Sequence, residues 1–308
     1  MYHRLYSSIY LLGIYSVFKQ HGVQYILYAD DIQFWIHSTV ENFSATIERA
    51  QQCVYHVKDW LRKNFLNLNE DKTEVIVLGN RQLTSRIEVK TVKLGDTVIQ
   101  FSSKVRDLGL IVDSPLTFHD HISHVSSSSF AALKTIARVR RSLSFENCLL
   151  LVNALILSRI LFCLSALNGI TDSEMRRLQR LMNAASCLTH SCCSIGSDVT
   201  SQDSLLLMPA KSLLTFRSAV LAHSVVENGQ PSYLFKLLCY KRSSRWHLRS
   251  HEQCTLEVPS RRTNIGRRAF SAFAPRLLNS LPLGLRNAPS IRVFKRDLME
   301  LLLESLSS

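Results

Sequence analysis

The sequence predicts an α+β fold, with short strands before Pro115 and helices through most of the chain after it. Three observations support this fold class. Two runs of β-branched, aromatic and large apolar residues bracket Ala29-Asp30-Asp31, a long amphipathic pattern follows them, and the apolar spacing becomes helical beyond Pro115. With 308 residues, of which 46% are hydrophobic, the chain can bury a core in two or three compact units.

The first predicted elements are a hairpin and a helix. Residues 24–28 and 32–37 are the two strands, and the acids of Ala29-Asp30-Asp31 lie at the tip between them. Residues 41–64 carry apolar side chains at steps of three and four, which predicts an amphipathic helix that ends at Asn64. Its apolar positions are Phe43, Ile47, Ala50, Val54, Val57 and Leu61.

Further short strands are predicted before Pro115. Residues 66–69 and 74–78 flank the polar turn Asn69-Glu70-Asp71-Lys72. Two more strands meet at Gly95-Asp96, and a last one ends where Asp113-Ser114-Pro115 breaks the pattern. These last strands span 87–94, 97–101 and 107–112.

After Pro115 the apolar period is that of helices. The run of serines at 126–129 weakens the first predicted helix, because serine hydroxyls compete for backbone hydrogen bonds. Residues 191–202, rich in serine and threonine, are the best candidate for a linker. The predicted helices span 119–142, 146–164, 173–188, 213–227 and 290–303.

The acid pair Asp30 and Asp31 is the strongest chemical signal in the sequence. Two carboxylates a few ångströms apart repel each other unless cations lie between them. Divalent cations remove that repulsion, and Mg²⁺ suits such hard oxygen ligands. The alternative is an ordinary solvated turn, which is the more common reason for two adjacent acids in a loop. The apolar strands on both sides favour the metal-binding interpretation.

Several segments resemble the reverse transcriptases of LINE-type (non-LTR) retrotransposons, in the order found in that family. Residues 25–35, centred on Tyr28-Ala29-Asp30-Asp31, resemble the polymerase motif that carries two catalytic aspartates. Residues 66–74, which include Lys72, are similar to the family's next motif. Residues 94–122 are similar to the segment that grips the primer and leads into the thumb. Motifs at 231–234, 268–282 and 294–296 resemble the C-terminal region of jockey-like elements.

The resemblance implies an architecture and a chemistry. It implies a partial polymerase palm over 1–116, built of β-hairpins plus a helix, then a helical thumb-like region over 117–195 and a basic, mainly helical C-terminal region over 196–308. The partners implied are an RNA template and a DNA primer, and two Mg²⁺ ions are the cofactors of the complete enzyme. By this resemblance Asp30 and Asp31 are metal ligands, Lys72 protonates the leaving pyrophosphate, and Tyr28 supports the primer terminus.

The sequence also departs from the family pattern. In a complete enzyme, a strand with a further catalytic aspartate and a Gln-Gly segment that shapes the nucleotide pocket precede the motif at Tyr28. Neither is found in the 27 residues before Tyr28. We therefore expect an RNA-directed DNA polymerase fragment with no appreciable activity by itself, because both metals would be poorly held.

The charge distribution supports a second class of function. The formal net charge is +13, and residues 236–296 contain fourteen Lys or Arg against two acids. Such a segment suits a nucleic-acid-binding module whose cations contact phosphates, with Arg261, Arg262, Arg267 and Arg268 as the candidates. The same composition also fits a solvated basic face without a ligand, or a structural remnant without a role.

Two further patterns concern the compartment. The apolar run 149–167 is interrupted by Asn153, Ser158 and Arg159, so we expect a core helix and no membrane partner. The apolar stretch 5–18 lacks the small-residue pattern of a signal-peptide cleavage site. The eight cysteines contain no CxxC pair, which is typical of a reduced intracellular protein of the nucleus or cytoplasm.

Overall fold

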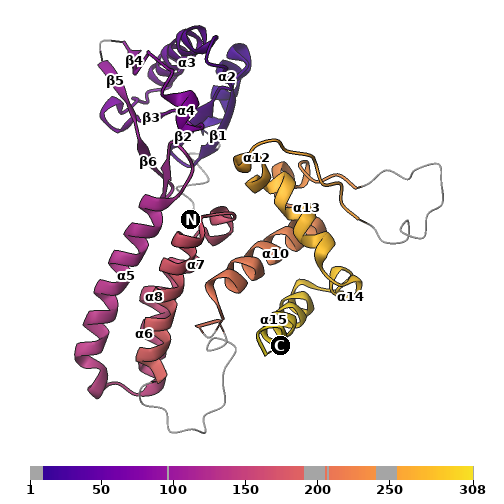
Figure 1. Ribbon diagram of the computed structural model, residues 1–308. Coiled ribbons are helices and arrows are strands. Elements are labelled where there is room, and N and C mark those ends of the chain that lie inside the picture. Colours follow the sequence, from indigo (N-terminus) through magenta and orange to yellow (C-terminus); the bar gives the residue numbers. More distant parts are fainter. Residues whose placement is uncertain (1–9, 96, 191–204, 207, 241–254, 308) are drawn as a thin grey trace, which may run out of the picture. The chain divides into compact units, whose positions relative to one another are not determined.

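The computed structural model describes residues 10–95, 97–190, 205–206, 208–240 and 255–307. It forms two compact units, Met1–Thr117 and Phe118–Ser308 (Figure 1). The first unit contains the strands and the second is helical, which confirms the predicted α+β fold class. The division into three parts at 116 and 195 stays a prediction.

The predicted N-terminal hairpin is present in the first unit. It follows η1 (Leu11–Ile14) and α2 (Tyr15–His21), and Gly22 ends α2 with a left-handed φ of 60°. Strands β1 (Gln24–Tyr28) and β2 (Asp31–Trp35) then pair antiparallel. Strand β2 ends two residues earlier than predicted.

The predicted amphipathic helix is α3 (Phe43–Lys63), and it supplies one side of the core of this unit. Cys53, Val57 and Leu61 are buried on its inner face, against Ile14 and Phe18 of the preceding helical segments. The helix ends at Asn64, whose Nδ2 donates a hydrogen bond to the Trp60 carbonyl oxygen at 2.8 Å. The inner face of the hairpin, with Tyr25, Leu27, Ile32 and Phe34, packs against this core.

The polar turn after α3 differs from the prediction. Residues 66–69 form no strand, and the turn itself is a short 3₁₀ helix, η2 (Glu70–Lys72). The Asn69 side chain accepts a hydrogen bond from the Lys72 backbone N–H at 3.2 Å, a cap that competes with extended structure. Only Val75–Ile76 of the predicted strand 74–78 is extended, as β3, and the single-turn helix α4 (Arg81–Thr84) follows.

The remaining strands form two small sheets. Strand β5 (Thr97–Ser102) pairs antiparallel with β4 (Thr91–Leu94), so the predicted strand pair is present, although the first strand starts at Thr91 and not at 87. Strand β5 also pairs parallel with β3, which was not predicted. The predicted strand 107–112 is confirmed over 110–112, but 108 and 109 form a turn. The chain reverses there, and β6 (Lys104–Asp107) pairs antiparallel with β7 (Leu110–Asp113). Leu108 and Gly109 both have positive φ, 44° and 97°, as a two-residue hairpin turn requires.

The second unit begins with long helices. Helix α5 (His119–Val139) packs along α8 (Asp172–His190), and the serine run lies inside α5 without breaking it. The predicted helix 146–164 is present as one helical run over 145–161, whose middle, η4, is a π-helix. It ends three residues earlier than predicted, and Cys163 beyond its end has a positive φ of 53°. The segments between α5 and α8 are η3 (Arg140–Ser142), α6 (Phe145–Val152), η4 (Asn153–Leu157), α7 (Ser158–Leu161) and η5 (Leu164–Leu167).

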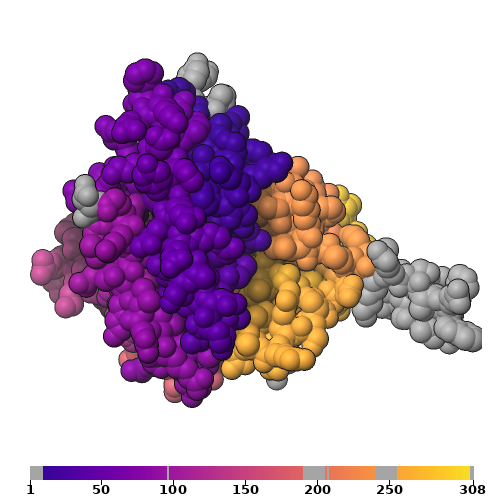
Figure 2. Space-filling view, turned by 90° about the horizontal axis from the view of Figure 1, so that it is seen from above, coloured from indigo at the N-terminus to yellow at the C-terminus, as the bar shows by residue number. Residues whose placement is uncertain are grey.

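The C-terminal helices bury a second core against α10 (Ala210–Asn228), and their yellow surface adjoins the orange surface in Figure 2. Phe294 and Leu298 of α15 (Ile291–Ser307) are fully buried in it. Helix α13 (Phe270–Ser280) was not predicted, since Pro275 lies inside it. The predicted linker 191–202 lies outside the described residues. The other short helices are α11 (Ser232–Phe235), α12 (Asn264–Arg268) and α14 (Leu283–Arg286).

Candidate functional site

The acid pair lies at the reversal between β1 and β2. Ala29 and Asp30 are the two residues of the turn, and Asp31 is the first residue of β2, paired with Tyr28 across the hairpin. Side chains of directly paired residues point to the same side of a sheet. Asp31 and Tyr28 therefore share one face of the hairpin, next to the turn that carries Asp30.

The turn has an unusual backbone. Ala29 has a φ of 56°, in the left-handed region that favours glycine. An L-residue with a side chain is less stable there by about 1 kcal/mol. Residues in such sparsely populated conformations are often found where a turn positions functional side chains.

Both carboxylates are accessible. Asp30 and Asp31 are exposed, and neither side chain has a hydrogen-bond or ion-pair partner among the residues that the structure describes. Their oxygens are the ligand type that Mg²⁺ prefers, so the pair fits part of a magnesium site. Within the described ranges, however, no group of three or more His, Cys, Asp or Glu side chains gathers as a metal site.

The outer face of the hairpin is partly apolar. Gln24, Ile26 and Tyr28 alternate with inward-facing residues along β1, and 49% of Tyr28 is exposed. On the opposite face Tyr25 packs on Phe18, with ring centroids 4.6 Å apart. The strand is held by its inner face, which leaves Tyr28 available beside Asp31.

The structure brings a third carboxylate toward this face, on Asp107, which was not among the predicted metal ligands. Gln33, paired with Ile26, donates a side-chain hydrogen bond to Asp107 on β6. Gln33 is two residues after Asp31 and so lies on the same face of β2. No sequence signal indicates this contact, because the two residues are 74 positions apart.

Lys72 is exposed at the end of η2, and no hydrogen bond or ion pair in the described structure joins it to the acid pair. Its neighbour Glu70 anchors the turn instead, through an ion pair with Lys58 and a hydrogen bond from Thr97. The bonds from Lys58 and Thr97 lower the pKa of the Glu70 carboxyl. The anchored turn leaves the Lys72 ammonium accessible to a ligand.

The four candidate arginines lie in the second unit and differ in their surroundings. Arg261, Arg262 and Arg267 are exposed. Arg268 is half-buried: its Nε donates to the Asn168 carbonyl oxygen at 2.9 Å, and its guanidinium carbon lies 5.5 Å from the centre of the Phe118 ring. Arg261 and Arg267 also make internal bonds, from Arg261 Nη2 to Ser271 Oγ and from Arg267 Nε to the Arg261 carbonyl oxygen, both at 3.3 Å, but their side chains stay exposed.

An α+β unit with an exposed acid pair at a hairpin tip is the arrangement expected of a polymerase palm. The family model described as reverse transcriptase (RNA-dependent DNA polymerase) matches residues 5–112, which include the hairpin, α3, η2 and most of β7. No curated protein and no solved structure matches the chain. The start of the chain is thus similar to a reverse transcriptase, which supports an RNA-directed DNA polymerase with RNA and DNA as its substrates.

The described helices include no candidate membrane span. None of them is both long enough and apolar enough to cross a membrane.

Proposed function

We propose that residues 1–116 are part of the palm of a LINE-type, jockey-like non-LTR reverse transcriptase, followed by a thumb-like region and a basic C-terminal region. One observation carries this proposal. Asp30 and Asp31 are exposed, unpartnered carboxylates at a hairpin tip, and they lie within the span that matches the reverse transcriptase model.

In this proposal four residues of the chain have distinct roles. Asp30 and Asp31 hold Mg²⁺, which reverse transcriptase domains generally use. A metal pair held there would supply activation of the attacking 3′-hydroxyl and stabilisation of the leaving pyrophosphate. Tyr28 lies beside Asp31 on the same face and supports the primer end. Lys72 is the general acid that protonates the pyrophosphate, a role for which its exposed ammonium is available.

We also propose that the chain alone has no appreciable polymerase activity. Asp30 and Asp31 belong to no group of three or more possible metal ligands among the described residues, and Asp107 reaches their face only through its bond to Gln33. Such a pair would hold two metal ions weakly, since ligand number and supporting contacts set metal affinity. Primer extension on an RNA template with Mg²⁺ is expected to give no incorporation. Incorporation that depends on Asp30 and Asp31 would contradict this part of the proposal and would support the assignment of the acids.

The metal assignment has its own test, with Mn²⁺ as a paramagnetic probe. Titration of the whole chain, followed by electron paramagnetic resonance, is expected to show weak binding that Asp30→Asn and Asp31→Asn each reduce by about tenfold, since each removes one charged ligand. The matched control is Asp71→Asn, another exposed aspartate of the same unit. Equal Mn²⁺ binding by all three variants would rule out the acid pair as the ligand.

A second candidate function is a nucleic-acid-binding module in the C-terminal region. The observation that favours it is the exposure of Arg261, Arg262 and Arg267 in a segment with few acids. These arginines would contact phosphates through charge and add affinity that does not depend on sequence. Arg268 contributes less in this proposal, because its guanidinium is engaged with Asn168 and Phe118.

A further inference from the structure

A pocket of about 320 Å³ lies between α5 and α8, and the proposed function does not use it. Ser123, Ser126, Ser127 and Phe130 line it from α5, at the spacing that places side chains on one face of a helix. Arg177 and Arg180, three residues apart, line it from α8. Both helices belong to the second unit, so the pocket is defined within one compact body.

Ser126 is the residue that points to a ligand. It is a pocket-lining residue with 7% of its surface exposed, and its Oγ has no hydrogen-bond partner in the described structure. A buried hydroxyl without a hydrogen-bond partner destabilises the folded protein, because nothing replaces the hydrogen bonds that it makes to water in the unfolded chain. Rotation about the single χ1 bond is sufficient to turn such a hydroxyl toward a bound group.

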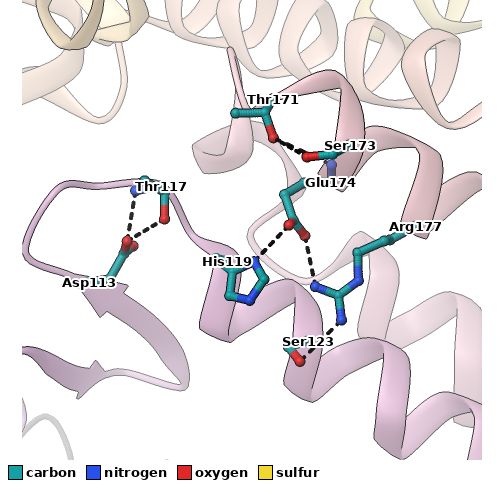
Figure 3. Close-up of polar contacts among 8 residues, drawn as sticks. All are labelled: Asp113, Thr117, His119, Ser123, Thr171, Ser173, Glu174 and Arg177. Carbon is teal, nitrogen blue, oxygen red and sulfur yellow. Dashed lines mark hydrogen bonds and ion pairs between the residues drawn. The ribbon is translucent and has the colours of Figure 1, made fainter.

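The pocket contains hydrogen-bond donors that have no acceptor within the described structure. Arg177 donates from Nη2 to Ser123 Oγ at 3.2 Å, so the Ser123 proton remains for another acceptor (Figure 3). Arg180 is exposed and has no hydrogen-bond or ion-pair partner among the described residues. A guanidinium group can only donate hydrogen bonds, and a serine hydroxyl can donate one as well as accept. A ligand that fits must therefore accept several hydrogen bonds.

The charge of the pocket is positive after its acidic neighbour is counted. Glu174, 8% exposed, accepts from Arg177 Nη1 at 3.3 Å and contacts His119 Nδ1 at 2.8 Å. Figure 3 shows the Arg177 guanidinium between Glu174 and Ser123. This pairing orients Arg177 and offsets its charge, whereas Arg180 retains a full positive charge at the pocket.

We propose that this pocket binds a phosphate group. Phosphate oxygens accept several hydrogen bonds and carry the negative charge that Arg180 requires of a partner, and Ser126 would gain the acceptor that it is missing. Phe130 is 39% exposed at the same pocket and offers an apolar surface to an organic group attached to the phosphate. All of its residues lie in the thumb-like region and none in the hairpin, so the acid pair and this pocket can be tested separately.

The test uses the whole chain and two probes, inorganic phosphate and a single-stranded oligonucleotide, with affinities measured by calorimetry at constant ionic strength. Ser126→Ala and Arg180→Gln are each expected to weaken binding by about tenfold, as loss of one hydrogen bond to a charged group does. Ser126→Ala is also expected to keep the melting temperature or raise it, since it removes a hydroxyl that has no partner.

Matched controls separate this site from the general basicity of the chain. Ser129→Ala removes another buried, unpartnered hydroxyl of α5, and Arg176→Gln removes an exposed charge of α8, but neither residue lines the pocket. Both are expected to change affinity less than twofold. The proposal would be overturned if Ser129→Ala or Arg176→Gln lowered the affinity as much as Ser126→Ala and Arg180→Gln do.

The two probes distinguish the source of the phosphate. If the variants weaken only the oligonucleotide, and Phe130→Ala weakens it too, the ligand is a phosphate of a nucleic-acid strand. If the variants weaken inorganic phosphate as strongly, the site takes a small free phosphate. If Ser126→Ala and Arg180→Gln leave the affinity for both probes unchanged, the pocket is not a phosphate site.

Discussion

At the scale of single residues, the backbone of Ala29 determines how the hairpin reverses. Its positive φ places the side chain in a region where a Cβ crowds the backbone, and Asp30 follows directly in the turn. The two acids are displayed because the chain turns within two residues and not over a longer loop. The conformation of Ala29 is therefore part of how Asp30 and Asp31 are presented.

Substitution of Ala29 tests this conformation. Ala29→Val is expected to lower the free energy of unfolding by about 1–2 kcal/mol, because a β-branched side chain is poorly tolerated at positive φ. Ala29→Gly is expected to change it by less than about 0.5 kcal/mol, since relief of strain is offset by the greater chain entropy of glycine. Urea denaturation followed by tryptophan fluorescence, with Trp246 replaced by Phe so that only Trp35 and Trp60 of the first unit emit, measures both. Equal values for the two variants would contradict the left-handed turn.

A second residue-scale feature is a pair of histidines between α2 and α3. His21 Nε2 lies 2.7 Å from His56 Nδ1, and the rings are tilted with centroids 4.9 Å apart. Burial lowers the pKa of His21, and the neighbouring charges of His56 and Arg49 lower it further. Protonation of His21 therefore opposes the packing of α2 on α3.

The expected pH dependence follows from this direction. The folded-state pKa of His21 lies below its unfolded value of about 6.5, so the unfolded chain binds the proton more readily. The free energy of unfolding is therefore highest above the unfolded-state pKa of about 6.5, and it falls as the pH decreases through that pKa. Melting temperatures measured from pH 8 to 5 should decrease less for His21→Asn than for the parent chain; equal slopes would contradict the prediction. His223, whose pKa burial also lowers, contributes a background slope common to both.

At the scale of elements, Arg140 ties the end of α5 to the end of α8. The side chain is 8% exposed, and it donates from Nε to the Leu188 carbonyl oxygen at 3.0 Å and from Nη2 to that of Thr189 at 3.3 Å. The last carbonyl groups of a helix lack partners within the helix and carry partial negative charge. A buried arginine is stabilised there without a carboxylate.

Removal of this group should destabilise the helical unit. Arg140→Met is expected to lower the free energy of unfolding by about 2–3 kcal/mol, because two or three hydrogen bonds to a charged group are lost and the carbonyl groups stay partly buried. Arg141→Met, at the exposed neighbouring position, is expected to change it by less than about 0.5 kcal/mol. Urea denaturation followed by circular dichroism gives both values. Similar losses in the two variants would show that Arg140 does not hold α8.

At the scale of the whole molecule, the basic charge is concentrated in one part of the chain. Residues 236–296 carry fourteen of the 37 lysines and arginines but two of the 24 acids. Association with a polyanion through this region must weaken as salt rises, because each neutralised phosphate releases counterions. The slope of log affinity against log salt concentration is therefore a measure of how many phosphates the region contacts.

The exposed arginines are expected to account for part of that dependence. The triple variant Arg261→Ala, Arg262→Ala, Arg267→Ala should reduce the slope of log affinity against log salt by about two for single-stranded RNA. Arg268→Ala should instead lower thermal stability, since it removes the bond to Asn168 and the contact with Phe118. Fluorescence anisotropy across a salt series measures the slope. A triple variant with an unchanged slope would contradict binding through these arginines.

The fold class, the hairpin with its acid tip and the helix α3 were predictable from the sequence alone, because each depends on side-chain spacing within about 20 neighbouring residues. The 107–112 segment shows the limit of this reasoning: it is as apolar as a strand, yet it reverses at Leu108 and Gly109 because β7 pairs with β6. The contacts between distant polar groups became visible only in the folded chain. Folding joined Gln33 to Asp107, engaged Arg268 internally, and left Ser126 buried beside Arg180. Such contacts arise between residues far apart in the chain, where packing of whole elements sets the distances and local patterns carry no information about them.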